Sequence, residues 1–285
     1  MGFKCSLNIV VSESSFLDRV SLLKPYELLL DDESMDSLRK ADPTFPFVHD
    51  RSYYVNPTPI SDFPKRFAQL RPLADNLAIR SQYDIEETLL KTNLYRGHPS
   101  EGILTLSFSP WAQHPPLLEH GYLLLDLAYP SEKNQSFLPW DHPSLEFIWE
   151  IMRILNPTYG WLEGDWNPHP PEVDWLGRPW YIPSILPWQE GGERPQLVGP
   201  PLSEAVKAEF DLGDANNGLY MVKEIAERLY WIAQPGTVAE WEKYRWEMWH
   251  ELYKDTEVGK AHEAAIWRLR EALARIPTSV LDKQR

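Results

Sequence analysis

Short apolar runs bounded by glycine and proline dominate the first part of the chain. Residues 103–109 and 121–129 have the length and leucine-rich composition of buried β-strands. The Pro-rich segment between them, 110–121, predicts a hairpin loop. Shorter runs predict further strands at 4–11, 26–30, 77–83 and 179–186.

A helical period interrupts this series at residues 143–155. Apolar side chains recur there every three or four positions, and Pro143 lies in the predicted first turn. Asn156-Pro157 ends the pattern, since proline removes a backbone donor and disfavours helix in the residue before it. We therefore expect one amphipathic helix inside the strand-rich region.

Beyond the Pro- and Gly-rich segment 191–201 the apolar period is 3.6 residues, which predicts helices. We expect an α+β fold for residues 1–190, with a mixed or antiparallel sheet and helices on one face. A C-terminal helical region, 202–285, follows as its own unit or packs on the first as one unit. Its predicted helices cover residues 203–210, 217–233, 237–254 and 258–275.

Charge narrows the class of partner. The chain of 285 residues carries a formal net charge of −14, so phosphate backbones repel it and basic proteins are attracted. We expect no nucleic-acid partner and, because no window approaches 18 apolar residues, no membrane span. Cys5 is the single cysteine, which suits a reducing, cytoplasmic location.

Tryptophans and carboxylates alternate in the segment that starts at residue 161, and prolines between them restrict the backbone. Aromatic side chains supply much of the energy of protein interfaces, and acidic side chains steer basic partners. We interpret this segment as an acidic binding loop. Its candidate partner-binding residues are Trp161, Glu163, Asp165, Trp166, Glu172, Asp174 and Trp175.

Two aromatic positions in the C-terminal region are also candidates for partner binding. The predicted helix 237–254 has an unusually wide apolar arc that includes Trp246, and this arc is either core or partly an interface. Trp267 faces away from the apolar stripe of the last predicted helix. It either packs under a loop or is an exposed anchor.

An enzyme remains an alternative. Glu163 and Asp165 could serve a carboxylate hydrolase, and Asp165, His169 and Asp174 could hold a metal. Their spacing matches no catalytic or metal template, and the chain has no nucleophile elbow, phosphate-binding loop or dinucleotide fingerprint. We therefore expect no catalytic residues, no metal and no cofactor. A scaffold or adaptor is a second alternative.

The order of features between about residues 100 and 188 is informative in itself. Two apolar strands and an amphipathic helix are followed by Asn156-Pro157-Thr158-Tyr159-Gly160 and by Gly177-Arg178-Pro179-Trp180-Tyr181. This order resembles the bacterial immunity proteins of polymorphic-toxin and type VI secretion systems. The resemblance implies an α+β fold, no reaction, and binding and neutralisation of a cognate protein toxin, often a nuclease. The long C-terminal helical part departs from that family.

Overall fold

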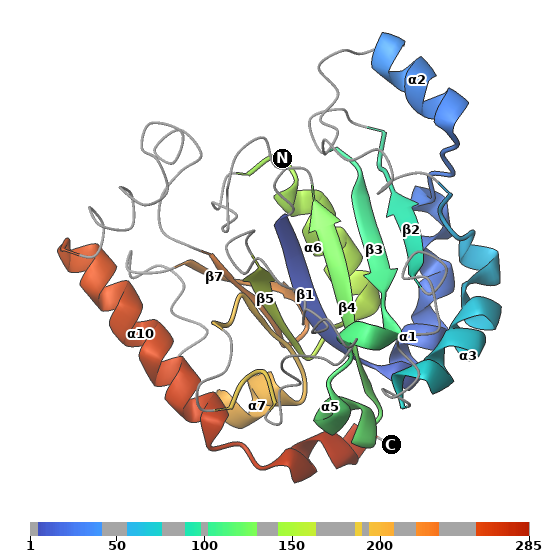
Figure 1. Ribbon diagram of the computed structural model, residues 1–285. Coiled ribbons are helices and arrows are strands. Elements are labelled where there is room, and N and C mark those ends of the chain that lie inside the picture. Colours follow the sequence, from blue (N-terminus) through green and yellow to red (C-terminus); the bar gives the residue numbers. More distant parts are fainter. Residues whose placement is uncertain are drawn as a thin grey trace, which may run out of the picture.

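The computed structural model describes residues 5–41, 56–75, 89–97, 102–129, 142–163, 186–189, 194–207, 221–233 and 255–284 (Figure 1). Its strands are β1 (Cys5–Ser12), β2 (Leu90–Leu94), β3 (Leu104–Phe108), β4 (Tyr122–Tyr129), β5 (Tyr159–Glu163), β6 (Leu197–Val198), β7 (Met221–Ala226) and β8 (Leu229–Ala233). They form one eight-stranded sheet in the order β2-β3-β4-β1-β5-β6-β8-β7. Every neighbouring pair is antiparallel.

β1 lies inside the sheet, between β4 and β5. Its register with β4 runs from Cys5 opposite Tyr129 to Ser12 opposite Tyr122. Successive side chains of a strand point to opposite faces, so Leu7 joins one apolar cluster and Val10 the other. Burial on both faces explains why β4, Tyr-Leu-Leu-Leu-Asp-Leu-Ala-Tyr, is almost continuously apolar. The strands predicted at 4–11, 103–109 and 121–129 are confirmed.

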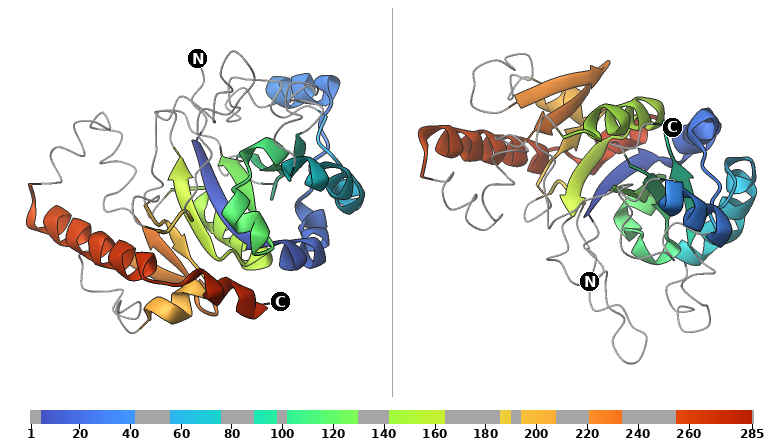
Figure 2. Two further views of the ribbon diagram at one scale, coloured as in Figure 1. Left: turned by 60° about the horizontal axis from the view of Figure 1, so that its bottom comes forward. Right: turned by 90° about the horizontal axis from the view of Figure 1, so that it is seen from above.

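Helices cover both faces of the sheet. They are α1 (Glu13–Arg19), α2 (Asp32–Ala41), α3 (Phe63–Ala74), α5 (Pro115–Glu119), α6 (Leu145–Leu155), α7 (Leu202–Val206) and α10 (Glu257–Ala274), with 3₁₀ helices η1 (Val20–Tyr26), η3 (Ile60–Asp62), η6 (Pro110–Ala112) and η7 (Thr278–Gln284). The first cluster packs under α1, α3 and α6, and the second under α5, α7 and α10. The α+β class is confirmed. The predicted arrangement with all helices on one face holds only for α1, α3 and α6, because α5, α7 and α10 cover the other face. In both Figure 1 and Figure 2, α10 runs along the side of the molecule opposite α2 and α3.

The predicted end of α6 at Asn156 is confirmed. Asn156 adopts the left-handed conformation, with φ at 49°, and its N–H donates to the Met152 carbonyl at 2.7 Å. Asparagine tolerates this conformation, which often ends a helix. The chain then enters β5, where Gly160 lies close to β1: an added Cβ would be 3.2 Å from the Asn8 oxygen. This approach explains a glycine in mid-strand.

The prediction of a helix at 217–233 is wrong, because the described part of this segment forms the β7–β8 hairpin. Val222 and Ile232 join the second apolar cluster, whereas Ile225 and Leu229 join the first. Apolar residues thus recur on both faces of a hairpin with an irregular register, and that spacing imitates a helical stripe. Residues 202–285 are therefore not purely helical, since two strands of the sheet lie within them.

The segment predicted as a linker, 191–201, contains β6, which pairs with both β5 and β8. The hairpin loop predicted at 110–121 contains η6 and α5. Within it, the Gln113 amide exchanges hydrogen bonds with the Leu124 backbone, at 2.7 and 2.9 Å. The Gln113 side chain thus bonds the Leu124 backbone as a neighbouring strand would. It does so in the first half of β4, since β3 pairs with β4 only from Asp126 to Ala128.

The apolar pattern does not predict β2, because Lys91, Thr92 and Asn93 interrupt it. The outer edge of β2 receives the Leu28 N–H at the Asn93 oxygen, at 2.9 Å. In place of the strand predicted at 26–30, the structure has an extended segment along the edge of β2, with a single bridge from Glu27 to Leu94. In the described part of the chain, no helix is both long and apolar enough to cross a membrane.

Candidate partner-binding site

β5 carries the start of the segment interpreted as an acidic binding loop. Trp161 leaves only 7% of its surface exposed and packs beside Tyr159, with ring centroids 6.0 Å apart. We correct its role accordingly: a ring held between the sheet and its covering elements supports the strand and is not an exposed anchor. Glu163 ends β5 opposite Ser6, and the loop follows from that end of the sheet.

The other residues of that prediction lie outside the described residues, and the partner-binding role stays a prediction for them. The same holds for the metal alternative at Asp165, His169 and Asp174 and for the strand predicted at 77–83. Most of the strand at 179–186 and the whole helix 237–254 also fall outside. The partner-binding candidates concerned are Asp165, Trp166, Glu172, Asp174, Trp175 and Trp246.

Trp267 is the candidate that the structure places most clearly. It lies on α10, the helix predicted at 258–275, which begins where the Thr256 hydroxyl accepts the Gly259 N–H at 3.0 Å. This side-chain cap satisfies one of the free donors of the first turn. The apolar stripe of α10 packs on the second cluster through Ala265, Ile266, Leu269, Ala272 and Leu273.

The opposite side of α10 presents Trp267 to solvent, with 56% of its surface exposed. The Arg270 guanidinium lies 4.9 Å from the ring centroid, within the range of a cation–π contact. This contact holds the ring against its own helix, while more than half of the residue's surface stays accessible. Of the two alternatives for Trp267, the structure supports the exposed one.

A polar clasp holds α10 one turn before Trp267. Glu263 accepts a hydrogen bond from Arg194 at 2.6 Å, which ties the helix to the segment leading into β6. Beneath it His262 is buried, and burial, assisted by the nearby Arg194 charge, lowers the pKa of its imidazole to about 4. The imidazole is therefore neutral at pH 7. The clasp joins residues 69 positions apart, so no local pattern could have predicted it.

An exposed ring on a firmly held helix is suited to binding. Among the described residues, no group of three or more His, Cys, Asp or Glu is placed to hold a metal ion. Comparison with protein-family models, with curated proteins and with solved structures gives no match for this chain.

Proposed function

We propose that this chain is a non-enzymatic, cytoplasmic immunity protein that binds and neutralises a cognate protein toxin, basic and of the nuclease type. The observation that carries the proposal is the exposure of Trp267 on a helix whose other side is firmly packed. An indole that is more than half exposed, on a rigid element, suits an interface anchor because little side-chain entropy is lost on binding.

Charge supports a basic partner. The net charge of −14 creates a field that raises the encounter rate with a positively charged protein. A nuclease must carry such charge to bind phosphate. The resemblance of residues 100–188 to immunity proteins points to the same class of partner, and the acidic segment from Glu163 to Trp175 is a second proposed contact.

The proposal predicts that Trp267→Ala weakens toxin binding. If the ring is a hot spot worth about 2 kcal/mol, the dissociation constant rises about 30-fold. The change should lie mainly in faster dissociation, because close packing of the ring forms after the encounter and holds the docked complex together. The toxin to use is the product of the neighbouring gene, because immunity genes lie beside their toxins, and the measurement is surface-based binding kinetics at two salt concentrations.

Leu22→Ala provides a matched control. Leu22 in η1 is also 56% exposed, but it lies away from α10, so its truncation should leave the kinetics unchanged. The wild-type association rate should fall as salt is raised, since screening shortens the range of the charge attraction. The proposed function would be refuted if the product of the neighbouring gene did not bind this chain and did not harm a cell that lacks this chain.

A further inference from the structure

An open pocket of about 340 Å³ lies at the junction between β1 and α1, on a part of the molecule that the preceding proposal does not use. This volume is at the small end for ligand sites, enough for one side chain or a small molecule. The α5–β4 turn and the C-terminal η7 complete its wall. Its lining includes Ser12, Glu13, Ser14, His120, Tyr122 and Leu281.

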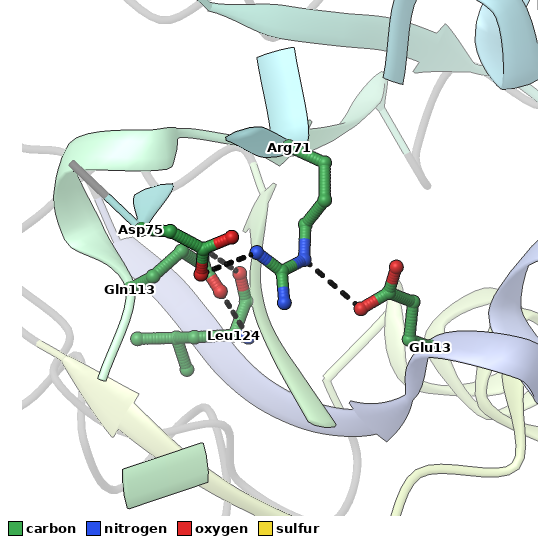
Figure 3. A network of polar contacts seen from close by, with 5 residues as sticks. All are labelled: Glu13, Arg71, Asp75, Gln113 and Leu124. Carbon is green, nitrogen blue, oxygen red and sulfur yellow. Dashed lines mark hydrogen bonds and ion pairs between the residues drawn. The ribbon is translucent and has the colours of Figure 1, made fainter. Parts of the chain in front are cut away.

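Glu13 gives the pocket its negative charge. Its Oε2 accepts the Arg71 Nε–H at 2.9 Å, and the same guanidinium donates from Nη1 to Asp75 at 2.8 Å. Arg71 and Asp75 do not line the pocket, whereas Glu13 does and places a carboxylate in its wall. Figure 3 shows the guanidinium between the two carboxylates, where its bond to Glu13 uses the Oε2 oxygen of that side chain.

Hydroxyl groups add further acceptors. The Ser12 and Ser14 oxygens lie 3.0 Å apart, and Ser12, although it precedes α1, makes no side-chain cap to that helix. Burial raises the pKa of the Tyr122 phenol, so its hydroxyl stays uncharged. The His120 ring is held through Nδ1 by Asp282 at 2.9 Å, which puts one more carboxylate behind the wall.

The walls also contain apolar surface. Leu17 and Leu281 line the pocket, and aliphatic surface of this kind suits the methylene stem of a long cationic side chain. A guanidinium offers five N–H donors in one plane, so it can bond a carboxylate and hydroxyls together. The lining contains no lysine or arginine, so a bound anion would find no such cationic partner there.

We infer that this pocket is a receptor for an arginine side chain presented by a basic protein partner. The identity of that partner as the toxin rests on the proposed function, but binding of the side chain itself does not. Glu13 provides the charge, Ser12 and Ser14 orient the guanidinium, and the two leucines cover its stem.

The test uses N-acetyl-arginine amide as the probe and the intact chain, followed by amide chemical shifts in NMR at pH 7.5. We expect saturable shifts at Ser14 and Gly121, with an affinity on the order of millimolar for a single side chain. Glu13→Gln should weaken binding about tenfold or more, because a hydrogen bond to a charged group is lost. Thermal melts of each variant verify folding.

Asp75→Asn is the matched control, since Asp75 shares Arg71 with Glu13 but does not line the pocket. It should bind within about twofold of wild type, because an exposed charge contributes little. Equal losses in both variants, equal binding of N-acetyl-glutamine amide, or preferred binding of acetate would each overturn the inference. Toxin binding is scored separately with Trp267→Ala, so failure of the proposed function is distinguishable from failure of this pocket.

Discussion

His262 lies beneath α10 with 2% of its surface exposed, and its pKa is lowered to about 4. In the unfolded chain a histidine titrates near pH 6.5. Below that pH His262 binds a proton in the unfolded state, whereas in the folded state it stays neutral until the pH nears 4. The contribution of His262 to the free energy of unfolding is therefore complete above about pH 6.5 and is lost as the pH falls to about 4. Its total is about 3 kcal/mol.

Replacing His262 with phenylalanine, which cannot titrate, should remove this component. We expect the free energy of unfolding of the variant to fall less steeply than that of wild type between about pH 6.5 and 4.5. Urea denaturation at several pH values measures it. Parallel curves for the two proteins would contradict the assignment of the acid sensitivity to His262.

The structural reason for a glycine at position 199 cannot be read from the sequence. Gly199 belongs to the segment predicted as a linker, 191–201, but the need for glycine comes from elsewhere. An added Cβ would lie 2.0 Å from the Pro157 oxygen and 2.8 Å from the Leu229 side chain. Both neighbours are distant in sequence, so the requirement is visible only in the folded chain.

At the scale of elements, the β7–β8 hairpin shows why periodicity misled. The segment lacks the Asn-Gly or Asp-Gly pair that marks short hairpins, and Arg228 takes the left-handed position instead, with φ at 60°. Contacts with α6 hold β7 in place: Lys223 Nζ lies 3.7 Å from the Trp149 ring centroid, and Arg153 donates to the Ile225 carbonyl at 2.7 Å. Tertiary contacts here override local preference.

The hairpin predicts a graded response at Arg228. Arg228→Gly should leave stability unchanged or raise it slightly, since glycine adopts positive φ freely and the half-exposed pair with Glu204 contributes little. Arg228→Val should cost about 1–2 kcal/mol, because a β-branched residue is strained there. Chemical denaturation compares the two variants. Valine as stable as glycine would argue against a left-handed residue at this turn.

On the scale of the whole molecule, the sheet runs through the segment predicted as a domain boundary. Leu197, Leu229 and Trp231 belong to the same apolar cluster as Leu7 and Leu125. The first cluster is therefore incomplete without residues beyond 190. This supports the alternative in which the two regions pack together as one unit.

A fragment of residues 1–190 should therefore fail to fold, because strands β6, β7 and β8 and their side chains are missing from the shared core. Its NMR spectrum should lack chemical-shift dispersion, whereas the intact chain should unfold in one cooperative urea transition. A dispersed spectrum from the fragment would show instead that residue 190 marks a true domain boundary.

The sequence by itself determined the elements whose signal is local. These are the long buried strands β1, β3 and β4, the helices α6 and α10, the end of α6 at Asn156, and the outward direction of Trp267. Periodicity, proline and asparagine act within a few residues, so they can be read along the chain. Only the tertiary structure decided the β7–β8 hairpin, the burial of Trp161 and the pocket beside Glu13. Each depends on residues that are distant in sequence, and burial against them outweighs local preference because the free energy of packing exceeds that of propensity.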